Sequence, residues 1–128
     1  MKLNPDCVRD ILIDVEEKST FSNFASYTSK EDFKPLLDKY SYEESMYHIR
    51  QCEHSNLFMD KVHYFMDGGC MIKDLSPKGH QFLENIRSPK NWTETKSIAS
   101  RIGSMSLNVL ESVSAQVISN LISGQFNK

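Results

Sequence analysis

The residue types best suited to recognising another molecule gather in one short stretch of the chain. Gln and Arg side chains read base edges in a DNA major groove, whereas Tyr and Ser hydroxyls contact phosphate. All four types, with a histidine, occur at Ser45, Tyr47, His48, Arg50 and Gln51. The set predicts a face that binds DNA or another partner, and an ordinary solvated helix face is the alternative. Two glutamates, Glu43 and Glu44, precede it and would repel phosphate.

Basic residues form a second candidate surface. They surround a predicted hairpin and the helix after it, and the set comprises Lys61, Lys73, Lys78, Arg87, Lys90 and Lys96. Lysines and arginines contact a phosphate backbone or an acidic partner. Lys61 and Lys73 flank the hairpin, so we expect these two to join the binding face. A simple solvated surface explains the whole set equally well.

Signatures of metal binding and catalysis are missing from the sequence. His48 and Cys52 lie four residues apart, which can share a metal on a helix, but the other histidines and cysteines have no recognised ligand spacing. We therefore expect no metal and no cofactor. No nucleophile elbow, zinc-protease motif, phosphate-binding loop or dinucleotide fingerprint occurs. The sequence thus predicts a protein that is not an enzyme.

Net charge excludes a strongly basic domain. The 128 residues include 15 Lys and Arg against 17 Asp and Glu. The segments differ, because residues 1–60 are acidic, residues 61–103 are mildly basic and residues 104–128 are almost uncharged. Three cysteines without a CxxC pair, no signal peptide and no long apolar run predict a reduced, cytoplasmic protein that does not enter a membrane.

Helix-capping signals define the elements that must position the candidate residues. Asn4 and Pro5 predict a helix over residues 5–18. Residues 19–30 show no clear period and fit either a short strand or a packed loop, and residues 31–40 predict a short helix. A capping box then begins the helix that carries the first candidate set, with Ser41 and Glu44 as its members. That helix should bury Met46, Ile49 and Cys52 (or Glu53), and Asn56 should close it.

A β-hairpin follows this helix. Strands are expected over residues 57–65 and 70–75, joined by the tight turn Asp67-Gly68-Gly69. Helices are then expected from Pro77 until Ser88-Pro89 ends the helix, from residue 91 to about Ile102, and from residue 104 to about Ser123. The order predicts an α+β fold, a winged-helix-like domain over residues 1–88 with a helical extension at residues 89–128. In such a domain the helix before the hairpin is the recognition helix.

Four segments also resemble a known but uncharacterised family. They are NPDCVRDIL at 4–12, YSYEESMYHIRQCE at 40–53, LSPKGHQFLENIR at 75–87 and WTETK at 92–96. The chain is similar in these segments to a domain-of-unknown-function family of small proteins from bacteria, prophages and phages. The resemblance implies a winged-helix-like core with a helical C-terminal extension, and it implies no activity.

The last predicted helix points to another subunit. Its apolar residues recur at helical spacing, namely Leu107, Leu110, Val113, Val117 and Leu121, while serines take its less apolar positions. A solvated helix is normally charged on one side. We therefore expect these residues to drive homo-oligomerisation, and packing back onto the same chain is the alternative.

These features predict a non-enzymatic winged-helix protein of phage or mobile-element type that acts as a DNA-binding or regulatory module. The expected partners are a second copy of the chain and double-stranded DNA. The alternative is a protein-interaction module that binds and inhibits a host protein without binding DNA. The weak net charge and the acidic start of the recognition helix favour this alternative.

Overall fold

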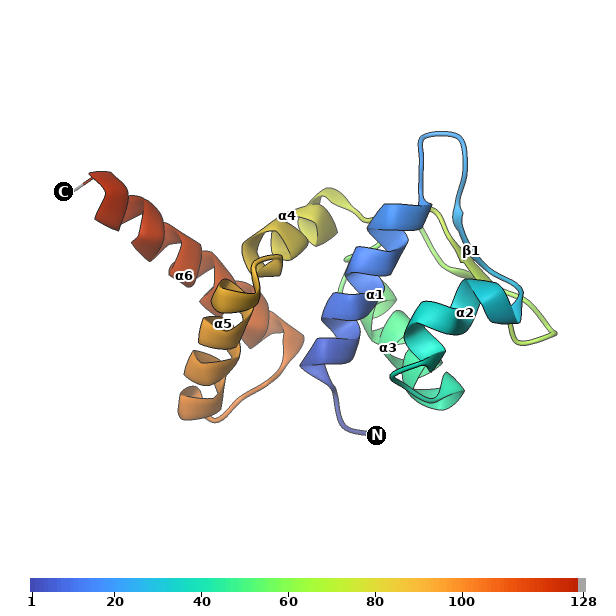
Figure 1. Cartoon of the computed structure of the whole chain (residues 1–128), viewed down its shortest axis with the longest axis horizontal. Helices are drawn as coiled ribbons and strands as arrows, with labels where there is room; N and C mark the ends of the chain where they lie inside the picture. Colours follow the sequence, from blue (N-terminus) through green and yellow to red (C-terminus); the bar gives the residue numbers. More distant parts are fainter. Residues whose placement is uncertain (127–128) are drawn as a thin grey trace. The chain divides into compact units, whose positions relative to one another are not determined.

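In the computed structural model, which describes residues 1–126, the chain is an α+β protein (Figure 1). This confirms that the fold is α+β, as the sequence predicts. The chain divides into two compact units, the first ending at His80 and the second beginning at Gln81. That division falls inside a helix, whereas the sequence places the domain boundary at residue 88. Each unit has its own buried core.

The first unit contains three helices and the strands of one small sheet. Its elements are α1 (Pro5–Lys18), β1 (Ala25–Tyr27), α2 (Lys30–Leu37), α3 (Tyr42–His54), β2 (His63–Tyr64) and β3 (Cys70–Ile72). Helix α4 (Pro77–Ile86) crosses the division. The second unit continues with α5 (Pro89–Ile102) and α6 (Leu107–Phe126).

Side-chain caps fix the helices of the first unit where the sequence predicts them. The Asn4 side chain accepts a hydrogen bond of 3.1 Å from the Asp6 N–H at the start of α1. At α3, Ser41 Oγ accepts from the Glu44 N–H at 3.1 Å, and Glu44 Oε1 accepts from the Ser41 N–H at 3.3 Å. This capping box is confirmed, and so is the turn at Asn56, whose φ of 61° ends the helix.

The sheet is antiparallel and has β3 in the middle. Met71 on β3 pairs with Ser26 on one side and with His63 on the other. The predicted strand over residues 57–65 is wrong in length, because only His63–Tyr64 pair as a strand. Asp60 has a φ of 63°, which interrupts extended backbone, and Phe58 makes only an isolated bridge to Leu75.

Residues 19–30, for which the sequence fits either a short strand or a packed loop, contain the strand β1. Tyr27 on this strand is fully buried, and its hydroxyl donates a 2.5 Å hydrogen bond to Asp14 on α1. Lys18 forms a 2.8 Å ion pair with the same carboxylate, and its ammonium lies 4.2 Å from the centre of the Tyr27 ring. Burial, followed by the contact with Asp14, raises the pKa of Tyr27. This cluster ties β1 to α1.

The second unit buries most of the residues that were expected to face another subunit. Helices α5 and α6 pack against each other, and Leu107, Leu110, Val113 and Val117 are buried. The expectation that these four form an oligomer contact is therefore wrong, because a helix of the same chain already covers them. Only Leu121 of that set is exposed. Among residues 1–126, no helix has both the length and the hydropathy needed to span a membrane.

Candidate functional site

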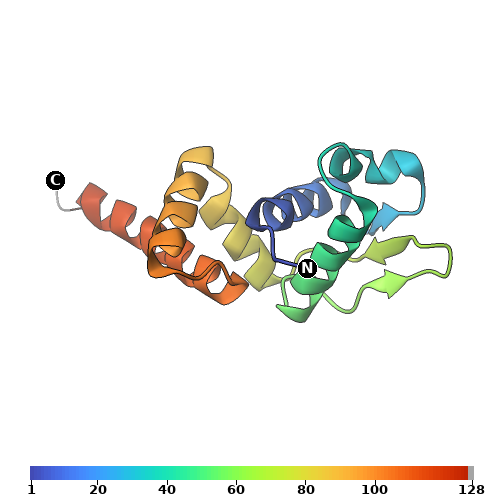
Figure 2. The same cartoon turned by 90° about the horizontal axis from the view of Figure 1, so that it is seen from below.

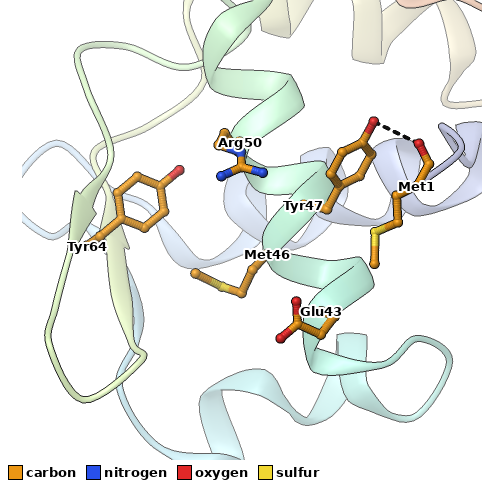
Figure 3. A pocket seen from close by; sticks show the side chains of 6 residues that line it. All are labelled: Met1, Glu43, Met46, Tyr47, Arg50 and Tyr64. Atoms are coloured by element: carbon orange, nitrogen blue, oxygen red, sulfur yellow. Dashed lines mark hydrogen bonds between the residues drawn. The ribbon is translucent and has the colours of Figure 1, made fainter.

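The exposed face of α3 borders a hollow beside the hairpin. Four α3 residues at helical spacing line it together with Met1 and with Tyr64 of β2, and the set is Met1, Glu43, Met46, Tyr47, Arg50 and Tyr64. We call this the α3–β2 hollow, and its volume is about 520 Å³. In Figure 3 the side chain of Met46 lies at its centre, with Glu43 and Arg50 toward opposite ends. Its surface is therefore apolar in the middle and charged at both ends.

Two residues of the predicted recognition set point the other way. Ser45 is fully buried and His48 is 1% exposed, so the expectation that they face a partner is wrong. They lie with Ile49 and Cys52 on the side of α3 that packs inward, against α1. Tyr47 and Gln51 are half-buried and Arg50 is exposed, so these three keep access to solvent.

His48 acts as a clamp on the N-terminal segment. Its Nδ1 lies 2.7 Å from the Glu44 carbonyl oxygen, and its Nε2 accepts a 2.7 Å hydrogen bond from the Asn4 N–H. These partners assign the tautomer with the proton on Nδ1. Because both ring nitrogens are engaged, His48 has no lone pair left for the metal that its spacing from Cys52 suggested. The adjacent Tyr47 hydroxyl donates to the Met1 carbonyl oxygen at 3.2 Å.

Glu53 attaches the hairpin to the end of α3. Its Oε2 accepts a 2.7 Å hydrogen bond from the Val62 N–H, and its Oε1 accepts from the Tyr64 hydroxyl at 3.2 Å. Burial, followed by the charge of Glu53, raises the pKa of Tyr64. Tyr64 therefore stays a neutral phenol that forms one wall of the α3–β2 hollow. Sequence reasoning missed this residue, because the side that a strand residue faces depends on the register of the hairpin.

The hairpin tip is fixed to the start of α3. Tyr42 Oη donates a 2.6 Å hydrogen bond to the Gly68 carbonyl oxygen. Gly68 has a φ of 93°, and a Cβ there would lie 2.9 Å from the same hydroxyl, so glycine suits the turn. Before the turn, Phe65 is 40% exposed and Met66 is fully exposed. The tip thus presents apolar side chains rather than cations.

The predicted basic residues are divided between the two units, and several of them have partners within the chain. Lys73 pairs with Asp60 at 3.2 Å, and Lys61 lines a separate hollow of about 670 Å³ that also contains Glu53 and Asp60. Lys78 donates to the Ser55 carbonyl oxygen at 3.0 Å. The other three lie in the second unit, where Arg87 pairs with Glu84 at 2.8 Å and Lys96 stacks over Trp92.

Ser19, Asp74 and His80 come together in the first unit. Ser19 Oγ donates to Asp74 Oδ1 at 2.9 Å, and His80 Nε2 lies 3.7 Å from the same oxygen. The carboxylate thus stands between hydroxyl and imidazole, whereas activation of a serine needs the imidazole next to the hydroxyl. Among residues 1–126, no three His, Cys, Asp or Glu side chains come close enough to share a metal ion.

The cysteines are shielded from reaction. All three are fully buried in the first unit. Burial, together with acidic neighbours, raises the pKa of Cys7 and of Cys70 to about 12. Because the thiolate is the reactive form, these two thiols are poor nucleophiles and poor metal ligands at neutral pH.

Comparison with known proteins yields one family. A family model described as "Hypothetical protein (DUF2513)" matches residues 2–106. No curated protein and no solved structure matches the chain. The matched range contains every residue of the α3–β2 hollow except Met1, and it ends just before α6.

Proposed function

This chain belongs to the DUF2513 family, and we propose that it is a non-enzymatic module of winged-helix type that binds another protein. The binding surface consists of the α3–β2 hollow and the apolar hairpin tip, Phe65 and Met66. We propose further that the protein is of phage or mobile-element type and that this partner is a host protein.

The order and pairing of elements support the winged-helix type. Three helices interleave with three strands in the order α1, β1, α2, α3, β2, β3, and the sheet order is β1-β3-β2. Figure 2 shows the β2–β3 hairpin beside α3. In a winged helix, α3 occupies the place of the recognition helix and the hairpin that of the wing. The fold type therefore presents this face for binding a macromolecule.

One observation carries the choice of a protein partner, namely the composition of that face. Met46, Tyr47 and Tyr64 line the hollow, and the tip adds Phe65 and Met66. Aromatic residues, methionine and arginine are enriched in protein interfaces. DNA affinity instead depends on many cations that contact phosphate, and α3 carries one arginine against three glutamates. The face therefore suits an apolar protein surface better than a duplex.

Duplex DNA is the second candidate, and Arg50 is the observation that favours it. This arginine is exposed on the outer side of α3, where an arginine reads guanine in the major groove. Lys61 is also exposed, but it lines the second hollow together with two carboxylates. A DNA-binding reading would thus rest on Arg50 and on few phosphate contacts.

Site-specific crosslinking tests the proposal. A photoreactive phenylalanine replaces Met46 in one variant and Lys30, an exposed residue at the start of α2, in the control. After irradiation, we expect only the Met46 variant to crosslink to another protein and to give one adduct of defined mass. Adding Arg50→Glu to the Met46 variant should abolish the adduct, because this change reverses the charge at one end of the hollow.

Mobility shift on random duplex DNA at low salt decides between the two candidates. We expect no shift from the unmodified chain. A shift that weakens steeply with added salt and disappears in Arg50→Glu would replace the protein partner with DNA. Equal adducts from the Met46 and Lys30 positions would refute the hollow as a specific site.

A further inference from the structure

The solvent-facing side of α6 carries no charge. Among residues 107–126 the only charged residue is Glu111. The exposed positions of the helix include Ser112, Ala115, Gln116, Ser119, Ile122 and Phe126. The exposed side of a helix in a soluble protein is normally rich in charged residues. Here Ile122 is 52% exposed and Phe126 is 84% exposed. The side that faces water therefore has the composition of a contact surface.

This side is also hollowed beside α4. A hollow of about 320 Å³ lies there, lined by Gln81, Asn85, Ala115, Ile118, Ser119 and Ile122, with Ser123 at its end. Ala115, Ser119 and Ser123 are four residues apart, so they share one face of the helix. Small side chains on that face allow another helix to approach closely. In both views the last turns of α6 extend past α5 (Figures 1 and 2).

We propose that this face binds the α6 helix of a second copy of the chain, antiparallel, around a two-fold axis at Ser119. A two-fold contact sets each surface group against the same surface on its partner. A charged residue close to the axis would therefore meet its own charge. The uncharged run from Ser112 to Phe126 satisfies this requirement.

The residue order fits such an antiparallel pair. With the axis at Ser119, Ala115 of one copy lies opposite Ser123 of the other, so small residues meet along the centre. Phe126 then lies opposite Ser112, where a large side chain meets a small one. The two helices can thus approach closely while Ile122 and Phe126 become covered, and this burial of apolar surface favours association.

The opposite flank of α6 is less suited to a second copy. A hollow of about 320 Å³ there includes Leu121 with Lys90 and Glu94. A contact on that side would bring charged groups into the interface core, where charges are depleted. The self-association expected from the sequence is therefore assigned to a different face of the same helix.

The mass of the full-length chain in solution, measured by sedimentation equilibrium over a wide concentration range, tests the proposal. We expect a dimer, and we expect Ile122→Asp to be a monomer with at least roughly a tenfold weaker association constant. Leu121→Asp is the matched control, because Leu121 is 49% exposed on the same helix and receives the same change. It should stay dimeric. A monomeric wild-type chain at the highest concentration, or equal loss in both variants, would overturn the proposal.

Disulfide trapping tests the axis without weakening the contact. In Ser119→Cys the two new thiols should meet across the axis within the reach of a disulfide. The native cysteines are buried and do not compete. We expect a covalent dimer to form under mild oxidation roughly ten times faster than in Leu121→Cys, because only the first pair is adjacent. Equal rates would show that α6 does not pair at Ser119 and would overturn the two-fold contact.

Discussion

Helices α3 and α6 depart from the usual rule of burial in opposite directions. On α3, the polar residues Ser45 and His48 are buried. On α6, the apolar residues Leu121, Ile122 and Phe126 are exposed. The buried histidine is explained within the chain, because both its ring nitrogens have hydrogen-bond partners. The exposed Ile122 and Phe126 of α6 have no such internal explanation, and in the proposed dimer the second copy covers them.

The inner sides of the two helices also have different neighbours. The inner side of α3 packs against α1 and holds the N-terminal segment, so its outer side stays open for the proposed partner. The inner side of α6 completes the packing of α5, so only its outer side is free to meet a second copy. We therefore expect changes on the two inner sides to affect stability, and changes on the two outer sides to affect binding.

The largest expected effect is a core truncation in α6. Leu110→Ala removes a fully buried side chain and should destabilise the second unit by about 2–5 kcal/mol. Leu121→Ala, on the half-exposed part of the same helix, should cost less than about 1 kcal/mol. Urea denaturation followed by circular dichroism measures both. Equal losses would show that Leu110 does not lie in a core.

His48→Ala tests the corresponding inner side of α3. It removes the ring that links Asn4 to Glu44 and should destabilise the first unit by about 2–3 kcal/mol. Amide hydrogen exchange should also accelerate at Asn4, whose N–H loses its acceptor. Tyr47→Phe is the control, because it removes only one exposed hydroxyl next to the clamp. An unchanged midpoint in His48→Ala would contradict the role of the clamp.

His48 and Leu110 show which features of the structure could not be predicted from the sequence, whereas the helix caps show which could. Caps at Asn4, Ser41 and Asn56 are local, so the bounds of α1 and the capping box of α3 follow from neighbouring residues. His48 is different, because its partner Asn4 lies 44 residues away and no periodicity reveals it. The same limit applies to Leu110, since a stripe of apolar residues does not show whether α5 or a second copy covers it. Sequence thus predicts the elements better than the surfaces between them.

The stability of the first unit should depend on pH through Asp32, a charged member of the cap that begins α2. The Thr28 N–H, with further hydrogen bonds from Thr28 and Ser29, holds the pKa of Asp32 below its usual 3.8. The carboxylate therefore contributes stability above about pH 4, and this contribution is lost as pH falls through the lowered pKa. Asp32→Ala should cost about 0.5–1 kcal/mol at neutral pH and nothing in strong acid.

Thermal melts of wild type and Asp32→Ala across the acid range measure this difference. Glu31→Ala is the control, because it removes a carboxylate from the same first turn without opening the capping box. Its difference from wild type should vary less with pH. A constant difference between wild type and Asp32→Ala at all pH values would show that the carboxylate's charge does not act through the cap.

The smallest expected effect is a gain in stability rather than a loss, and it concerns the inner side of α3. Ser45 Oγ is buried and has no hydrogen-bond partner among residues 1–126. Its lost hydration therefore lowers the free energy of unfolding. Ser45→Ala removes that cost and raises helix propensity. We expect stability to be unchanged or higher by up to about 1 kcal/mol, and the Met46 crosslink to be retained. A loss of binding with intact stability would instead show that this hydroxyl reaches the partner, and that the inner side of α3 opens when the partner binds.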